Sequence, residues 1–136
     1  MAYYDFVSNA HGEPSAKRIA RSTTLYVTNT VNPLTAGNVD SEYITNNSGV
    51  LKFKKACKIL IHYELTSVDY SQWVKMELYL NNSLLGSTIE ASNGQYKNGS
   101  FIREVSKDDT FYGKAWPYDG GGGSIPRYTI YVLTEE

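Results

Sequence analysis

The segment CKILIHYEL, residues 57–65, decides the fold because its apolar and polar side chains alternate. One face of the segment carries Cys57, Ile59, Ile61, Tyr63 and Leu65. A period of two predicts a β-strand with one face toward a core. Residues 74–80 (VKMELYL) repeat the pattern, whereas residues 128–133 (YTIYVL) are largely apolar on both faces. The final segment is therefore predicted to be a strand that is covered on two sides.

Shorter strand candidates and turn signals fill the rest of the chain. The candidate strands are residues 23–31, 49–56, 101–105 and 110–116, and the turn signals are residues 46–49, 81–82, 93–94, 98–99 and 108–109. Short strands separated by turns at intervals of about 8–12 residues are typical of an antiparallel sandwich or barrel. We expect an all-β chain, with an N-terminal arm over residues 1–20 and an antiparallel β-sandwich domain over residues 21–136. Only residues 13–21 (EPSAKRIAR) are compatible with a short helix.

The charge and the hydropathy pattern limit the kind of partner. The 136 residues carry 13 basic and 14 acidic side chains, a net charge of −1, so no nucleic-acid binding through phosphate neutralisation is expected. No apolar run reaches the roughly 18 residues of a membrane helix, so no membrane insertion is expected. The N-terminus lacks the apolar stretch of a signal peptide, which predicts synthesis in a cytoplasm. The 12 tyrosines suit amphipathic strands or a recognition surface.

The side chains that catalysis requires are sparse. His11 lies in the arm and His62 on the polar face of a strand, and the chain has no G-x-S-x-G nucleophile motif. The lone Cys57 lies on an apolar face, where a cysteine behaves as a small hydrophobic residue. Asp108 and Asp109 form an acidic pair that a polar turn explains better than a metal site does. We therefore predict no enzyme, no metal site and no cofactor.

The order of the strand segments along the chain resembles the pattern of a known family. Residues 46–66, 74–86, 101–116 and 128–133 follow the order of the tumour necrosis factor-like jelly roll, and the complement-type globular head is the most similar form. The matching positions are Val50, Leu51 and Phe53, the central strand 57–65, Val105 with Lys107, Asp108 and Asp109 at a tight turn, and residues 111–115 and 128–133. The turn has Asp-Asp where the family usually has Gly-Asp. The resemblance covers about two thirds of the chain and implies a jelly-roll topology.

The same resemblance implies an assembly. Members of this fold usually form trimers around an axis that apolar and aromatic side chains line. Tyr131 and Leu133 lie on the second face of the last strand and are the first candidates for a subunit interface. Tyr79 and Tyr63 are further candidates. The alternative is that these four side chains close the core or the edge of their own domain.

Four consecutive glycines, Gly120 to Gly123, precede the last strand. In a jelly roll this loop lies at one end of the sandwich, where binding loops gather on a rigid scaffold. Aromatic rings with polar neighbours suit a carbohydrate. The ligand-binding residues predicted around the loop are Trp116, Tyr118, Asp119 and Arg127. The alternative is a flexible connection without a binding role.

The resemblance and the sparse catalytic side chains lead to three interpretations. A short jelly roll without a collagen-like stalk or signal peptide is more typical of a bacteriophage virion than of a secreted animal protein. The leading interpretation is a non-enzymatic phage structural protein of a tail, baseplate or head fibre, made in the bacterial host cytoplasm and located in the virion. It would form a homotrimer and contact other virion proteins or a host-surface glycan. The alternative is a monomeric carbohydrate-binding β-sandwich module, and a third interpretation is a small β-sandwich glycosidase or lyase.

Overall fold

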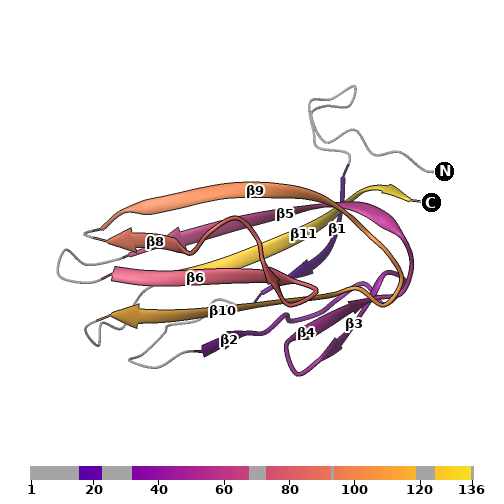
Figure 1. Ribbon diagram of the computed structural model, residues 1–136, viewed down its shortest axis with the longest axis horizontal. Coiled ribbons are helices and arrows are strands. Elements are labelled where there is room, and N and C mark those ends of the chain that lie inside the picture. Colours follow the sequence, from indigo (N-terminus) through magenta and orange to yellow (C-terminus); the bar gives the residue numbers. More distant parts are fainter. Residues whose placement is uncertain (1–15, 23–31, 68–72, 93, 119–124, 136) are drawn as a thin grey trace.

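The computed structural model describes residues 16–22, 32–67, 73–92, 94–118 and 125–135, and within these ranges the regular secondary structure is all β. The strands are β1 (Lys17–Arg21), β2 (Asn32–Leu34), β3 (Ile44–Asn47), β4 (Val50–Phe53), β5 (Cys57–Thr66), β6 (Trp73–Leu80), β7 (Ser83–Leu84), β8 (Ile89–Ser92), β9 (Tyr96–Val105), β10 (Thr110–Tyr118) and β11 (Ile125–Glu135). They form two antiparallel sheets that pack face to face (Figure 1). The predicted all-β sandwich is confirmed, while the strand predicted over residues 23–31 lies outside the described residues.

The first sheet has the strand order β1-β11-β5-β9. Its long strands β5 and β9 pair over their full length, from Cys57 opposite Val105 to Thr66 opposite Tyr96. At the edge, β1 pairs with β11. Residues 17–20 therefore belong to the sandwich and not to the predicted arm, and residues 17–21 form a strand where a short helix was considered.

The reason for this correction lies in the side chains of β1. Ile19 and Ala20 are both buried, and both belong to the core cluster between the sheets. Pairing with β11 covers these two side chains and satisfies the backbone groups of β1 at the same time. An isolated two-turn helix offers neither gain. Residues 1–15, the remainder of the predicted arm, lie outside the described residues.

The second sheet has the order β3-β4-β10-β6-β7, with β2 paired to β10 and β8 paired to β6. From β4 onward, the chain passes repeatedly between the two sheets, because β5, β9 and β11 belong to the first sheet and β6, β8 and β10 to the second. Crossovers of this kind give the jelly-roll topology. The fold class and topology predicted from the strand pattern are thus confirmed.

The core lies between the two sheets and follows the alternation seen in the sequence. Ile59, Ile61 and Leu65 of β5 are fully buried, and Met76, Leu78, Phe111 and Ala115 meet them from the second sheet. The rings of Phe111 and Tyr128 contact each other edge to face, with centroids 4.9 Å apart. Burial raises the pKa of Tyr128 well above its ordinary value of 10.0. Among the described residues, its hydroxyl has no hydrogen-bond partner.

Three of the predicted turns are present with backbone angles that favour small polar residues. The residues with left-handed φ angles are Ser48 (52°) and Gly49 (94°), Asn81 (51°) and Asn82 (64°), and Asp108 (76°). Side chains hold these turns: the amide of Gly49 donates to Asn46 Oδ1 at 3.1 Å, and the amide of Ser106 donates to Asp109 Oδ2 at 2.8 Å. The turn role assigned to Asp108 and Asp109 is therefore confirmed. At residues 93–94, only Gly94 is described.

The turn predicted at residues 98–99 is wrong, since both residues lie inside β9. Gly99 pairs with Tyr63 on the inner face of the sheet. A Cβ atom at position 99 would overlap the hydroxyl group of Tyr63. The glycine is thus required by the space that a tyrosine ring on the neighbouring strand takes up, and not by a turn.

Candidate functional site

A row of apolar side chains crosses the outer face of the first sheet. Strand pairing places Tyr131 of β11 opposite Leu60 of β5, and Leu60 opposite Ile102 of β9. Leu60 is only 5% exposed although it lies outside the core cluster, and Ile102 at the edge is 50% exposed. Leu133, at a bulge of β11, is also buried outside the core cluster. We call Tyr131, Leu60, Ile102 and Leu133 the apolar row.

The structure divides the four residues predicted for a subunit interface. Tyr131 and Leu133 belong to the apolar row. Tyr63 lies instead on the inner face of β5, packed against the core, with its ring centroid 5.8 Å from that of Phe101. Tyr79 lies on the outer face of the second sheet, because the side chains of its neighbours Leu78 and Leu80 point to the core. An interface on one face of the sandwich can therefore use Tyr131 and Leu133 together, but not all four residues.

A second group of polar and aromatic side chains covers the outer face of the second sheet. Tyr79 of β6 and Tyr112 of β10 are opposite each other, and their rings stack with centroids 4.9 Å apart and an angle of 12°. The hydroxyl of Tyr79 donates to Glu77 Oε1 at 2.5 Å, and that of Thr88 donates to Glu77 Oε2 at 2.6 Å. Lys114 Nζ lies 3.8 Å from Glu77 Oε1. We call these five residues the Glu77 cluster.

The charges of the Glu77 cluster are balanced within it. Hydrogen bonds from Thr88 and Tyr79 hold the pKa of Glu77 below its ordinary value of 4.5, despite partial burial. The same bond to Glu77 raises the pKa of Tyr79 above its ordinary value of 10.0. Lys114 also lies over the ring of Tyr79, with Nζ 5.1 Å from the centroid. Four polar side chains of the cluster thus have a partner on the same face, namely Glu77, Tyr79, Thr88 and Lys114, and Tyr112 contacts the cluster through its ring.

The predicted ligand-binding residues do not meet at one place. Trp116 lies on β10 beside the Glu77 cluster, with Lys114 Nζ 5.9 Å from its ring centroid. Arg127 lies on β11, which is in the first sheet. The backbone of Tyr118 ends β10, but its side chain lies outside the described part, as do Asp119 and the glycine run. Among the residues that can be placed, Trp116 and Arg127 therefore occupy different sheets.

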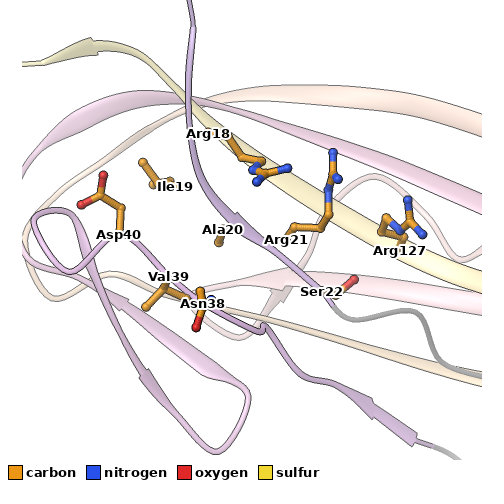
Figure 2. A pocket seen from close by; sticks show the side chains of 9 residues that line it. All are labelled: Arg18, Ile19, Ala20, Arg21, Ser22, Asn38, Val39, Asp40 and Arg127. Carbon is orange, nitrogen blue, oxygen red and sulfur yellow. The ribbon is translucent and has the colours of Figure 1, made fainter.

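Arg127 contributes instead to a groove that sequence reasoning did not find. The groove measures about 640 Å³ and runs along β1. Its lining consists of Arg18, Ile19, Ala20, Arg21, Ser22, Asn38, Val39, Asp40 and Arg127. Figure 2 shows the side chains of Arg18, Arg21 and Arg127 following one another along β1 and β11, with Asn38 and Asp40 across β1 from them. The sequence does not show that residues 18 and 21 lie near residue 127, because only the pairing of β1 with β11 brings them together.

The described residues lack both a metal-binding cluster and a membrane-spanning helix. Within the described ranges there is no group of three or more His, Cys, Asp or Glu side chains able to hold a metal ion. No helix in the same part of the chain is long and apolar enough to cross a membrane. His62, on the outer face of the first sheet, lies 3.8 Å from the carboxylate of Glu64.

The strand order and the two packed sheets are those of a jelly roll, a fold also found in complement globular heads and tumour necrosis factor-like ligands. The globular domain of zebrafish complement 1qA protein is similar at a TM-score of 0.56 and 11% identity, over 89% of this chain and 98% of that one. Rabbit GITRL gives a TM-score of 0.60 at 14% identity over 88% and 96%. Murine APRIL gives 0.54 at 6% over 84% and 98%. No protein-family model and no curated protein sequence matches the chain.

Proposed function

We propose that this protein is a non-enzymatic binding head that assembles as a homotrimer through the outer face of its first sheet. The observation that carries the proposal is the apolar row. It places Tyr131, Leu60 and Ile102 in one line across three strands, and one end of the line is half exposed. Burial of such a line contributes about 25 cal/mol for each Å² of apolar surface removed from water.

The fold supports the same assembly by analogy. Heads of the jelly-roll class to which this chain is similar commonly form trimers. A closed ring of three subunits also covers an exposed sheet edge such as that of β9. On this strand, the side chain of Tyr96 is 55% exposed and that of Ile102 is 50% exposed.

The oligomeric state is tested by sedimentation of the wild-type protein from low to high micromolar concentration. The proposal expects a single species of three chains of 15.2 kDa, or about 46 kDa. A species of one chain over the whole range contradicts it.

The place of this head in a bacteriophage virion is the most specific part of the proposal. It rests on the tyrosine-rich strand pattern and on the scarcity of catalytic side chains in the sequence, together with the jelly-roll fold. Other virion proteins or a host-surface glycan would then be its partners. Genes for tail and lysis proteins on either side of the coding sequence are the expected finding. A neighbourhood of metabolic or secretion genes contradicts the virion assignment.

A second candidate function, a monomeric carbohydrate-binding module, is favoured by one observation on the second sheet. Trp116 and Tyr112 lie on the same outer face of β10, next to the carboxylate of Glu77. Aromatic rings beside a fixed hydrogen-bond acceptor suit a sugar ring. A glycan-array signal of the wild type that is lost in Trp116→Ala, together with a monomeric mass, supports this function. An unchanged signal in that variant excludes Trp116 from binding.

A further inference from the structure

The groove along β1 contains three arginines whose placement depends on a β-bulge. In a regular strand, side chains three positions apart point to opposite faces. The pairing of β1 with β11 shifts between Arg18 and Ala20, so that Arg18 lies opposite Tyr131 and Arg21 lies opposite Thr129. Ile19 and Ala20 both enter the core, while Arg18 and Arg21 both remain exposed. The bulge therefore turns two arginines to the outer face together.

Arg127 continues this line on the neighbouring strand. It lies two residues before Thr129 on β11, and residues two apart share a face of a strand. Arg21 is held in place because its Nε donates to Thr129 Oγ1 at 3.3 Å. Three guanidinium groups thus follow one another along one open groove (Figure 2).

Within the described residues, neither Arg18 nor Arg21 forms an ion pair with an acidic side chain. Asp40, the acid in the lining, makes an ion pair with Lys17 at 3.1 Å and accepts a hydrogen bond from the amide of Glu42 at 3.0 Å. Two described acids lie on the outer face of the first sheet: Glu64, opposite Arg127 and next to His62, and Glu104 of β9, opposite Lys58. The positive charge is therefore greatest around Arg18 and Arg21, away from Glu64.

We propose that this arginine groove binds the sulfate or carboxylate groups of an acidic polysaccharide. A guanidinium group presents its N–H donors in a planar fork that matches the oxygens of sulfate and carboxylate. An open groove with arginines in a line suits a repeating, extended anion better than a compact small molecule. The chain's net charge of −1 favours a glycan over a nucleic acid, whose binding depends on a broad basic surface.

This inference rests on the proposed role as a binding head, and it specifies the ligand class that such a head would take. It does not require the trimer. Arg18 is next to Tyr131 of the apolar row, and the groove extends from there toward Arg127. The groove and the apolar row therefore lie on the same outer face of the first sheet, meet where Arg18 is opposite Tyr131, and share no residue.

The test compares two double variants by isothermal titration calorimetry. Arg18→Gln/Arg21→Gln removes two exposed arginines of the groove. The matched control, Lys97→Gln/Lys107→Gln, removes the same charge from exposed residues on β9 and the turn after it, and β9 is at the opposite edge of the sheet. The probes are dextran sulfate, polygalacturonate, unsubstituted dextran, single-stranded DNA and sodium sulfate.

We expect the wild type to bind one or both acidic polysaccharides, more weakly as salt is added, and not to bind unsubstituted dextran. The groove variant should lose at least about tenfold in affinity, and the control should lose less than about twofold. The inference is overturned if neither acidic polysaccharide binds the wild type or if the control loses as much as the groove variant. Equally tight binding of DNA, or binding of free sulfate alone, also overturns it.

The mass of each variant in solution distinguishes a ligand site from a subunit interface. If Arg18→Gln/Arg21→Gln changes the number of subunits, the two arginines belong to the subunit interface and the ligand site is wrong. If the wild type is a monomer that binds an acidic polysaccharide through the groove, the trimer fails and the ligand site stands.

Discussion

The two outer faces of the sandwich both carry tyrosines, but the side chains beside the aromatic rings differ. On the second sheet, Tyr79 stacks on Tyr112 and donates to Glu77. On the first sheet, Tyr131 lies in a line with Leu60 and with Ile102, which is half exposed. A tyrosine in a strand therefore favours an interface where the apolar side chains beside it extend to an exposed residue such as Ile102. By this criterion, the first sheet and not the second is the face that we propose a neighbouring subunit covers.

The largest effect is expected at the exposed end of the apolar row. Ile102→Asp places a charge on the proposed interface, where burial of an unpaired carboxylate is costly. We expect the trimer to dissociate to monomers, with a threefold loss of mass measured by sedimentation. Because Ile102 is 50% exposed in the single subunit, the variant should fold normally.

Val50→Asp is the matched control for this variant. Val50 is an exposed aliphatic residue of similar accessibility, 40%, but it lies on β4 of the second sheet. We expect this variant to keep the mass of the wild type. Dissociation of both variants, or of Val50→Asp alone, contradicts the choice of the first sheet.

Gly99→Ala tests the packing of the Tyr63 ring on the inner face of the first sheet. The added methyl group would overlap the hydroxyl of Tyr63, so the ring must move against Phe101 and the core. We expect a loss of about 1–3 kcal/mol in the free energy of unfolding, measured by denaturant titration. Ser100→Ala, on the exposed face of the same strand, should change it by less than about 0.5 kcal/mol. Equal effects of the two variants would show that Tyr63 does not need this space.

Glu77→Gln tests whether the second sheet satisfies its own polar groups. The pKa of Glu77 is lowered in the folded state, so the ionised carboxylate stabilises the fold above its ordinary pKa of 4.5. This stabilisation decreases as the pH falls below 4.5, and it is lost once the pH has passed below the lowered pKa of Glu77 in the folded state. At pH 7, we expect the variant to lose about 1–2 kcal/mol in the free energy of unfolding.

The difference between the wild type and Glu77→Gln should shrink as the pH falls below 4.5, which thermal unfolding at several pH values measures. Glu104→Gln, an exposed residue of β9, serves as the control and should change little at any pH. A difference that stays constant with pH would mean that the charge of Glu77 does not support the cluster.

The smallest effect, of opposite sign, is expected in the core between the two faces. The hydroxyl of Tyr128 is buried and has no hydrogen-bond partner among the described residues. Removing it in Tyr128→Phe should raise the free energy of unfolding by about 1 kcal/mol, because a buried unsatisfied group costs about that much. Tyr96→Phe, at a ring that is 55% exposed, should have no measurable effect. A loss of stability in Tyr128→Phe would reveal a partner for the hydroxyl.

The sequence predicted the fold better than it predicted the sites, for a physical reason. Alternation along one strand is a local property, so the strands around Cys57 to Leu65 and Tyr128 to Leu133 could be recognised. The turns at residues 46–49, 81–82 and 108–109 were also recognisable, since small polar residues accept left-handed backbone angles. Gly99 was misinterpreted as part of a turn because its requirement comes from Tyr63 on another strand.

The sites depend on pairing between strands, which alternation does not specify. Tyr79 and Tyr131 look alike in the sequence, and only the strand order assigns them to different sheets. The arginine groove depends in addition on the bulge in β1, which brings Arg18 and Arg21 to one face. A bulge has no simple sequence signal in a segment as short as residues 17–21, so this groove could not be predicted.

The central claim, that copies of the chain cover the first sheet but not the second, is tested most directly by hydroxyl-radical footprinting of the tyrosine rings. The account predicts that Tyr131 is modified more slowly in the wild type than in Ile102→Asp, while Tyr79 and Tyr112 react at the same rate in both proteins. Equal modification of Tyr131 in the two proteins, or protection of Tyr79 and Tyr112 in the wild type alone, would contradict it.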